Sequence, residues 1–418
     1  MSTTTNHPKI AIIGAGPVGL TLAAILHHNN IPSAIFERES SATARSQGGM
    51  LDIHADAGQL ALIAAGLLPT FKKFARVEAE AQRLINFDGT VVLDENEELK
   101  NEQGDIEGRG RPEIDRRDLK DLLIAALPKD TVRWGKGVKG VVPVEGTQKW
   151  KLDFLDAGKE EDTEAGPYDL VLGADGAWSR VRPQLTGVRP YYSGVIALDL
   201  WITAEELKKR PDVSAFIGRG SCMVFGEGRF LPLQVHGDGS ARVYNCVKTG
   251  KGGVDEKVPS AREMLGLEGE GEVDWSDAKM RERFVERHFS DFAKEIRDVS
   301  LAMTDQPLLR PYFMLPVGHR WENRPGLTLL GDAAHLMTPF AGVGVNVGMV
   351  DAKELAEGII AYVKGEVDGL DKVLKTYEER MFERAKENAE LTSRMMEVEF
   401  GKDGCAKVAQ VMSGEWAP

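Results

Sequence analysis

The chain has 418 residues, of which 42% are hydrophobic and 28% charged, the composition of a soluble globular protein with one large domain or two closely joined ones. Its formal net charge of −13 argues against nucleic acid or an anionic membrane as a partner. The cysteines form no C-x-x-C pair, and no stretch has the pattern of a signal peptide or a membrane span. We therefore expect no disulfide framework, no metal site, no stable membrane association and a cytoplasmic location.

The first predicted element is a strand, Ile10–Ile13, whose apolar run is typical of a strand buried in a parallel sheet. Gly14, Gly16 and Gly19 follow it as G-x-G-x-x-G. The first permits a tight turn, the second lets backbone approach a pyrophosphate, and the third lets the next helix, predicted at 17–29, pack closely. The amides at the start of that helix would point at the phosphate.

Glu37 follows the next predicted strand, 33–36, at the spacing where a carboxylate accepts hydrogen bonds from ribose hydroxyls. The whole segment therefore predicts a dinucleotide site. A glycine turn without a ligand is the first alternative. A membrane segment is the second, and the three glycines, the proline and the short length argue against it.

Beyond Glu37, Arg45, Gly48-Gly49 and Asp52 lie in a loop whose basic group and flexible backbone suit phosphate or ribityl binding, with a plain surface loop as the alternative. Residues 55–65 predict a helix, and 81–93 predict two strands joined at Asp88-Gly89. Residues 96–111 form a polar loop in this prediction.

Residues 113–127 predict an amphipathic helix with leucines at helical spacing. Arg116 and Arg117 lie in its first turn, where the helix dipole disfavours cations, so we expect an arginine there to face an anion or a cofactor. Short strands follow within 132–154. A buried strand at 168–172 then leads to Gly173-Ala174-Asp175-Gly176.

From 191 to 247 the pattern changes to consecutive antiparallel strands with glycine turns. We expect 248–271 to be a loop and 275–298 to be a charged helix, and we interpret 191–305 as a second lobe that carries the substrate. A buried strand returns at 327–331, followed by Asp332. Residues 342–346 open a long apolar helix whose first amides are free. The tail, Leu370–Glu399, predicts a long helix that packs against both lobes, with a role in lining the substrate pocket as the alternative.

Three of these stretches make the chain resemble the single-component (class A) FAD-dependent aromatic monooxygenases. They are the turn at 14–19, the segment ADGAWSRVR at 174–182, and Gly331-Asp332-Ala333-Ala334-His335 continuing to Pro339. Within that family the chain is most similar to the tetracycline-inactivating flavin monooxygenases, on GAGPVGLT, ER…AR…GG…LD-x-H, EI-x-R-x-DL and GDAAHLM-x-PFAG-x-GVN. Thr338 and Val343 stand where that subgroup has proline and glutamine.

The resemblance implies an α/β fold with three parts. A Rossmann-like FAD-binding domain comprises 1–80, 105–190 and 306–369, an inserted antiparallel β-sheet substrate domain comprises 81–104 and 191–305, and a long C-terminal helix occupies 370–418. The cofactor-binding residues implied are Gly14, Gly16, Pro17, Val18, Gly19, Glu37, Arg38, Arg45, Gly49, Asp52, Arg116, Asp175, Gly331, Asp332, Pro339, Gly342, Gly344, Val345 and Asn346. Pro339, Gly342, Val343 and Gly344 would lie beside the isoalloxazine ring, and no side chain is assigned as catalytic. Substrate contacts are predicted from Met223, Phe225, Leu233, Val235, Met337, Thr338 and Phe340.

The resemblance implies insertion of oxygen into a phenol, enol or indole through a flavin C4a-hydroperoxide, with hydroxylation as the default reaction. The expected setting is secondary metabolism or antibiotic inactivation. FAD is the cofactor, NADPH or NADH and O2 are co-substrates, the substrate is a small aromatic or polyketide-like molecule, and a monomer is favoured. Three alternatives remain. One is an FAD-dependent oxidase or dehydrogenase without oxygen insertion, another is a non-catalytic flavin-binding protein that sequesters a small molecule, and the last is a flavin-dependent halogenase.

Overall fold

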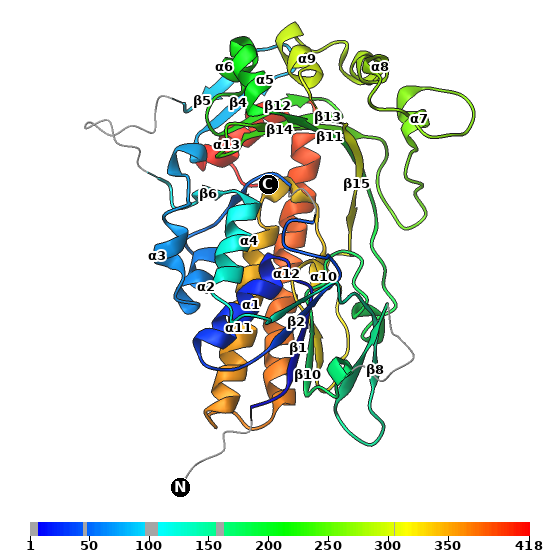
Figure 1. The fold of residues 1–418 in the computed structure, drawn as a ribbon. Coiled ribbons are helices and arrows are strands. Elements are labelled where there is room, and N and C mark those ends of the chain that lie inside the picture. Colours follow the sequence, from blue (N-terminus) through cyan, green and yellow to red (C-terminus); the bar gives the residue numbers. More distant parts are fainter. Residues whose placement is uncertain (1–6, 45–47, 97–107, 156–162, 305) are drawn as a thin grey trace.

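The computed structural model describes residues 7–44, 48–96, 108–155, 163–304 and 306–418. Two β-sheets dominate it, a five-stranded sheet near the N-terminus of the chain and a seven-stranded sheet at the other end of the molecule (Figure 1). The helix α12 (Leu370–Glu399) runs from beside the first sheet to the inner face of the second. Among the described residues, no helix combines the length and apolar character needed to cross a membrane.

The five-stranded sheet is wholly parallel, in the order β16-β10-β1-β2-β7. Its strands are β1 (Ile10–Ile13), β2 (Ala34–Glu37), β7 (Val132–Trp134), β10 (Leu170–Gly173) and β16 (Leu327–Leu329). The register aligns Ile13 with Gly173, and Gly173 with Leu329. The turns that follow β1, β10 and β16 therefore leave the same edge of the sheet, which is where ligands bind in parallel α/β sheets.

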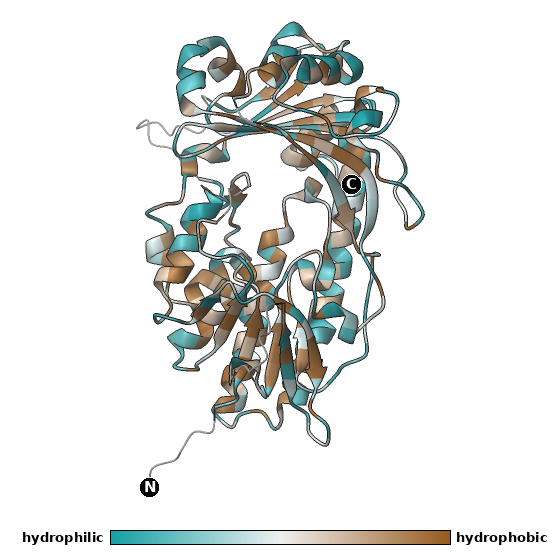
Figure 2. Cartoon of the chain, turned by 45° about the vertical axis from the view of Figure 1, so that its right-hand side comes forward, coloured by the Kyte–Doolittle hydropathy of each residue, from teal (hydrophilic) through white to brown (hydrophobic). Residues whose placement is uncertain are grey.

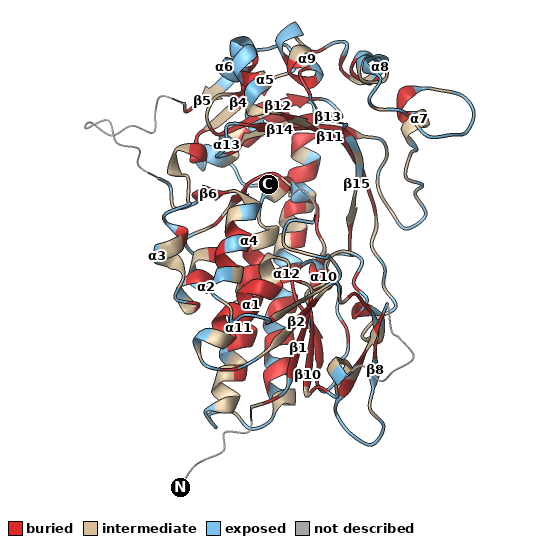
Figure 3. Ribbon diagram, viewed as in Figure 1, coloured by how far each residue is buried: buried red, intermediate tan, exposed pale blue. Residues whose placement is uncertain are grey.

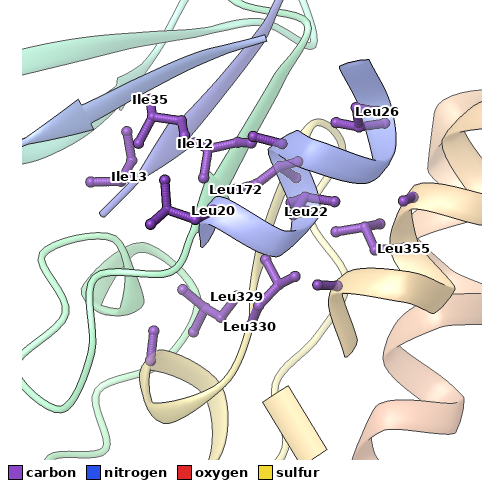
Figure 4. Packing of buried hydrophobic residues seen from close by; sticks show 14 of the residues in the cluster. Ile12, Ile13, Leu20, Leu22, Leu26, Ile35, Leu172, Leu329, Leu330 and Leu355 are labelled. Atoms are coloured by element: carbon purple, nitrogen blue, oxygen red, sulfur yellow. The ribbon is translucent and has the colours of Figure 1, made fainter. Parts of the chain in front are cut away.

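Both faces of this sheet are covered, which explains the unbroken apolar runs of its strands (Figures 2 and 3). Helices occupy one face: α1 (Pro17–His28), α2 (Gly58–Ala64), α3 (Leu68–Phe71), α4 (Arg116–Ala125) and α11 (Gly344–Val363). Leu20 and Leu22 of α1 are fully buried and lie between the strands and α11 (Figure 4). Each such leucine stabilises the fold by about 1.5–3 kcal/mol. The hairpin β8 (Val138–Pro143) and β9 (Trp150–Phe154) covers the other face, with the Phe154 ring 5.4 Å from that of Phe36.

The seven-stranded sheet has the order β15-β11-β14-β13-β12-β4-β5 and is antiparallel except for the β12–β4 pair. Its strands are β4 (Gln82–Asn86), β5 (Val91–Asp94), β11 (Tyr191–Ile202), β12 (Ser221–Gly226), β13 (Arg229–Val235), β14 (Ala241–Lys248) and β15 (Leu308–Met314). Its outer face packs on α5 (Ala204–Lys209), α6 (Pro211–Ile217), α7 (Ala261–Leu265), α8 (Ala278–Phe289) and α9 (Lys294–Leu301). The end of α12 and α13 (Gly404–Ser413) cover part of the inner face.

Short elements connect the two sheets. Strands β3 (Leu51–Asp52) and β6 (Glu113–Ile114) pair with each other, and α10 (Asp332–His335) follows β16. Single 3-10 turns lie at Val77–Glu80, Thr163–Ala165, Arg182–Gln184 and Pro339–Ala341.

Several predicted elements are confirmed. Strand β1 and helix α12 have the predicted bounds, α1 ends one residue before the predicted position, and β4 and β5 turn at Asp88-Gly89, where Gly89 has a φ of 88°. These elements follow from local signals: an apolar run ending in glycine, a proline at the start of a helix, and a turn dipeptide.

Other predicted elements are corrected. The helix expected at 113–127 begins only at Arg116, because Glu113–Ile114 pairs with β3. The helix expected at 275–298 is broken at 290–293, where the Ala293 amide donates to the carbonyl of Phe87. The loop expected at 248–271 contains α7, which begins with a capping box between Ser260 and Glu263.

The seven-stranded sheet also extends beyond the segments assigned to it from sequence. Strand β15 lies after the predicted boundary at 305 and pairs with β11, so this sheet takes a strand from the 306–369 segment. Strands β11 and β12 are consecutive strands in the chain but are not neighbours in the sheet. Helices α5 and α6 connect them.

Candidate functional site

The first turn of the candidate site is the glycine segment after β1. Gly14 has a φ of 105°, and a Cβ there would lie 2.5 Å from the carbonyl oxygen of Ala174. A Cβ on Gly19 would lie 2.2 Å from the carbonyl oxygen of Gly14. A Cβ on Gly16 would meet nothing within 4 Å. Gly14 and Gly19 are thus required by the packing of the turn itself, whereas the absence of a side chain at Gly16 keeps the backbone open to an approaching group.

The start of α1 is suited to an anion. Its N-cap is Gly16, no side chain caps it, and its first turn carries no acidic residue. The Glu37 carboxylate lies beside this turn, since it accepts hydrogen bonds from the amides of Ala15 at 2.8 Å and Glu39 at 2.9 Å. Arg38 is exposed at the end of β2, and Arg45 lies outside the described residues.

The other two signature turns converge on the first. A Cβ on Gly331 would lie 3.0 Å from Cγ2 of Val18, and one on Gly348 would lie 2.5 Å from the same atom, so both glycines allow Val18 to pack between them. In the second turn, Oδ2 of Asp175 accepts from the Arg180 amide at 2.6 Å. Its Oδ1 is buried and accepts no hydrogen bond from the part of the chain that the structure describes, and burial raises the pKa of this carboxyl.

The third turn is fixed by a buried ionic network. Nε2 of His335 lies 2.5 Å from Oδ2 of Asp351, which also accepts from the Gly331 amide at 3.0 Å. Arg384 of α12 donates to Oδ1 of Asp351 at 2.9 Å. Although burial alone lowers the pKa of His335, the Asp351 carboxylate raises it above its ordinary value, which favours an ion pair. His335 therefore holds the turn in place.

Asp332, unlike Asp351, has accessible surface. The surrounding protein nevertheless desolvates its carboxyl group, and this raises its pKa. Arg116 and Arg182 act on it electrostatically in the opposite direction. Asp332 and Arg116, 216 positions apart in the chain, are thus close enough to influence each other electrostatically.

Asp52 and Asn346 join the loop before β6 to the start of α11. The Asn346 side chain donates to the Asp52 carbonyl at 2.9 Å and accepts from the His54 amide at 2.9 Å. Asn346 was predicted to bind the cofactor, and its buried amide instead has protein partners that position this loop. A Cβ on Gly342 would lie 3.9 Å from Oδ1 of Asp52, and no side chain caps α11, so its first amides remain available near this carboxylate.

Arg116 links this region to the seven-stranded sheet. Its Nε donates to the Gly49 carbonyl at 2.8 Å, and the Gly49 amide donates to the Tyr244 hydroxyl oxygen at 2.9 Å. A Cβ on Gly49 would lie 2.3 Å from Oε1 of Gln234. The Gly49 loop therefore passes directly under β13 and β14, and a larger residue there would displace the Gln234 and Tyr244 side chains.

The inner face of the seven-stranded sheet faces the predicted cofactor turns. Met223 and Phe225 lie on this face, in one apolar cluster with Phe340. Met337, three residues before Phe340 in the chain, is also buried. Leu233 and Val235 belong instead to the outer cluster against α5–α9, which corrects their prediction as substrate contacts. Alternation along β13 places Phe230 on the inner face, and the sequence offered this signal, since residues i and i+2 share a face.

Thr338 is also corrected as a substrate contact. It is buried, its hydroxyl lies 3.3 Å from that of Thr392 in α12, and its carbonyl accepts from the same Thr392 hydroxyl at 2.7 Å. Thr392 thereby fixes the loop that carries Pro339, which is exposed, and Phe340. Sequence reasoning missed Thr392 and Tyr244 because both act through contacts distant along the chain.

Glu113 is a buried carboxyl at the edge of the site. It lies opposite Asp52 in the β3–β6 pair, and burial together with the Asp52 charge raises its pKa to about 8. Burial alone would also raise the pKa of Asp52, but His54 at 2.8 Å and Arg111 at 2.7 Å lower it. The pair thus consists of an ionised Asp52 and a neutral Glu113.

We expect Glu113→Gln to stabilise the protein increasingly as pH rises. Between the ordinary value of 4.5 and about 8, the native Glu113 binds a proton that the unfolded chain has lost, so wild-type stability falls with rising pH across this window. The variant should match the wild type near the lower limit and exceed it by on the order of 3 kcal/mol at the upper limit. Urea unfolding of both proteins across this range tests the slope, and a difference independent of pH would contradict the raised pKa.

The rest of the described structure adds neither a metal site nor a large cavity to the candidate site. No group of three or more His, Cys, Asp or Glu within the described ranges is placed to hold a metal ion. A cavity of about 610 Å³ lies beside Asp169 and Gly326, which precede β10 and β16, and thus at the opposite edge of the sheet from the three turns. None of the predicted site residues lines it.

Comparison with known proteins adds independent evidence. The FAD binding domain family matches residues 7–218 and 270–392. Monooxygenase asqM of Emericella nidulans is 30% identical to the chain, over 97% of this chain and 98% of its own. The structure of Klebsiella pneumoniae HpxO with FAD and uric acid is 19% identical, covers 99% of this chain and 94% of its own, and has a TM-score of 0.71. Tetracycline destructase Tet(51) is 18% identical, covers 98% and 95%, and has a TM-score of 0.66.

Proposed function

The chain belongs to the FAD binding domain family and is an FAD-dependent monooxygenase of the single-component aromatic class, and from this premise we propose that it hydroxylates a small electron-rich aromatic or enolic molecule. The observation that supports this proposal most is the convergence of three turns on one edge of the parallel sheet, directly under the inner face of a second sheet. The turns supply groups for a cofactor, and the second sheet supplies an apolar wall for a substrate.

The described residues fit FAD. In our proposal the open backbone at Gly16 and the uncapped start of α1 hold the pyrophosphate, and Glu37 accepts from the ribose. Asp332 and Arg116 hold the chain between the phosphates and the ring. When bound, FAD supplies the redox chemistry, in which NAD(P)H is oxidised and O2 is activated.

The protein's own contribution lies around the ring. Amides at the start of α11, from Gly344 onward, would stabilise negative charge there, because no side chain caps them. The aromatic rings of Phe230, Phe340 and Phe400 pack edge to face, with centroids 5.2–6.2 Å apart, and exclude water from this side. Excluding water favours oxygen transfer to the substrate over release of hydrogen peroxide.

The test uses the purified, FAD-loaded protein with NADPH or NADH and a panel of phenols, tetracyclines and indoles. We expect one class to accelerate NAD(P)H oxidation, suppress peroxide and gain the mass of one oxygen atom. Faster oxidation with stoichiometric peroxide for every compound would favour the oxidase alternative. Flavin that NAD(P)H never reduces would favour the sequestering protein.

A further inference from the structure

Glu399, the last residue of α12, is a buried carboxyl that finds no partner among the described residues. It is 3% exposed, and its Oε2 makes no hydrogen bond. Its neighbours on the helix, Met395, Met396 and Phe400, all belong to the apolar cluster under the seven-stranded sheet. It lies beyond residue 392, where the family match ends.

The other buried polar residues of α12 are matched to the elements that the helix crosses. Glu378 accepts from Trp321 at 3.0 Å and from Thr328 at 2.7 Å. Thr392 donates to the Thr338 carbonyl at 2.7 Å. Glu399 is the third buried polar residue of this helix, and the described residues leave it unmatched. An unpaired buried carboxyl destabilises a fold, so this one calls for a functional explanation.

The end of α12 lies on the side of the site where we place the substrate. The next residue, Phe400, lies 5.2 Å from Phe340 and 6.1 Å from Phe230 by ring centroids, and its carbonyl accepts from the Gly228 amide at 2.9 Å. The end of α12 therefore stands between the Pro339–Ala341 turn and the inner face of the sheet (Figure 1). Met223, Tyr244 and Tyr312, which pack on the same cluster, retain accessible surface.

The surroundings of Glu399 determine whether its carboxyl group is protonated. Burial raises the pKa of Glu399 well above its ordinary value. The inner-face arginines Arg242 and Arg310 lie 2.6 Å and 2.5 Å from the Asp199 carboxylate, and they pair with it. A neutral carboxyl offers one O–H donor and one carbonyl acceptor, which together match an uncharged hydroxyl or carbonyl group.

We propose that Glu399 is a specificity-determining residue whose protonated carboxyl hydrogen-bonds an uncharged hydroxyl or carbonyl of the aromatic substrate. This inference rests on the proposed function and narrows its substrate class. It assigns α12 a direct part in substrate binding. From sequence, this role was the alternative to a helix that only packs against both lobes.

Two variants of the FAD-loaded protein test the proposal. Glu399→Leu removes the hydrogen-bonding group at similar volume, Glu399→Gln retains a donor and an acceptor, and Glu397→Gln on the exposed side of the same turn is the control. The probes are naphthol and methylnaphthalene with the substituent at the same ring position, and binding is followed by the change in flavin absorption. The temperature of unfolding and the FAD content are recorded for each variant.

We expect the Leu variant to unfold at a higher temperature than the wild type, because an unpaired buried carboxyl is gone, and to bind naphthol about tenfold more weakly. The Gln variant should stay within about threefold of the wild type, and methylnaphthalene should bind all variants alike. The proposal is overturned if naphthol binds the wild type no better than methylnaphthalene, if the Leu variant binds both as the wild type does, or if Gln is as weak as Leu. Reduction of the flavin by NADPH in the same wild-type sample tests the proposed function separately.

Discussion

Alanine at Gly19 is expected to destabilise the protein and to abolish FAD retention together, whereas alanine at Gly16 is expected to weaken FAD binding alone. A Cβ on Gly19 would lie 2.2 Å from a backbone oxygen, so the start of α1 must move away from β1. Overpacking of this kind costs about 1–3 kcal/mol, and more where backbone is the neighbour. A Cβ on Gly16 would meet no protein atom within 4 Å, but it would occupy the space that we assign to the pyrophosphate.

Thermal unfolding of the FAD-free proteins and fluorescence titration with FAD separate these two effects. The Gly16 variant should unfold at the wild-type temperature and bind FAD at least about tenfold more weakly, which corresponds to one lost charge-assisted hydrogen bond. Equal FAD affinity in the Gly16 variant and the wild type would contradict the phosphate assignment of this turn. A Gly19 variant with wild-type stability would contradict the packing described here.

Asp332→Ala is expected to lower FAD affinity by about a hundredfold with the fold intact, and Asp351→Ala to destabilise the fold itself by about 3–5 kcal/mol. The two carboxylates lie on either side of the same turn. Asp332 faces accessible space, and removing it also removes a carboxyl whose charged form burial disfavours. Asp351 is fully buried, and removing it leaves the buried His335 without its counter-charge, while Arg384 keeps only Glu354 at 2.9 Å.

The measurements for this pair are denaturant unfolding without FAD and the flavin content of the purified protein. Asp332→Asn is the matched control, because it keeps the shape and loses the charge. Full flavin content and full NAD(P)H turnover in Asp332→Ala would refute its role in FAD binding. Wild-type stability in Asp351→Ala would show that the network around His335 contributes little.

The sequence predicted the turns at the edge of the parallel sheet better than the faces of the second sheet, for a physical reason. Turns such as Gly14–Gly19 and Asp175–Gly176 are specified by residues next to each other, so a single chain carries the whole signal. The strand β13 is different. Its run from Phe230 to Leu233 is apolar, with buried residues in the clusters on both faces of the sheet, so distant partners set the side that each residue takes. Leu233 and Val235 were misplaced for this reason.

The contacts of α12 were likewise beyond local reasoning. Its bounds follow from its composition, but nothing near Thr392 or Glu399 in sequence indicates that one meets the Thr338 loop and the other meets nothing. The ionic network of Asp351, His335 and Arg384 also joins three separate segments. The sequence shows these three residues but not that they interact, because their interaction depends on the packing of α11 against α12.

The interleaving of the two sheets has a consequence for how the chain folds as it is synthesised. The parallel sheet receives its last strand from Leu327–Leu329, and the other sheet receives β15 from Leu308–Met314, so neither sheet has all its strands until more than 300 of the 418 residues have been made. Neither half can close early, and long-range strand pairing of this kind is slow. The nascent chain therefore carries the apolar strands β1 and β10 in an incomplete sheet until β16 has been made. We expect this interval, rather than the finished fold, to set the demand for chaperones during expression.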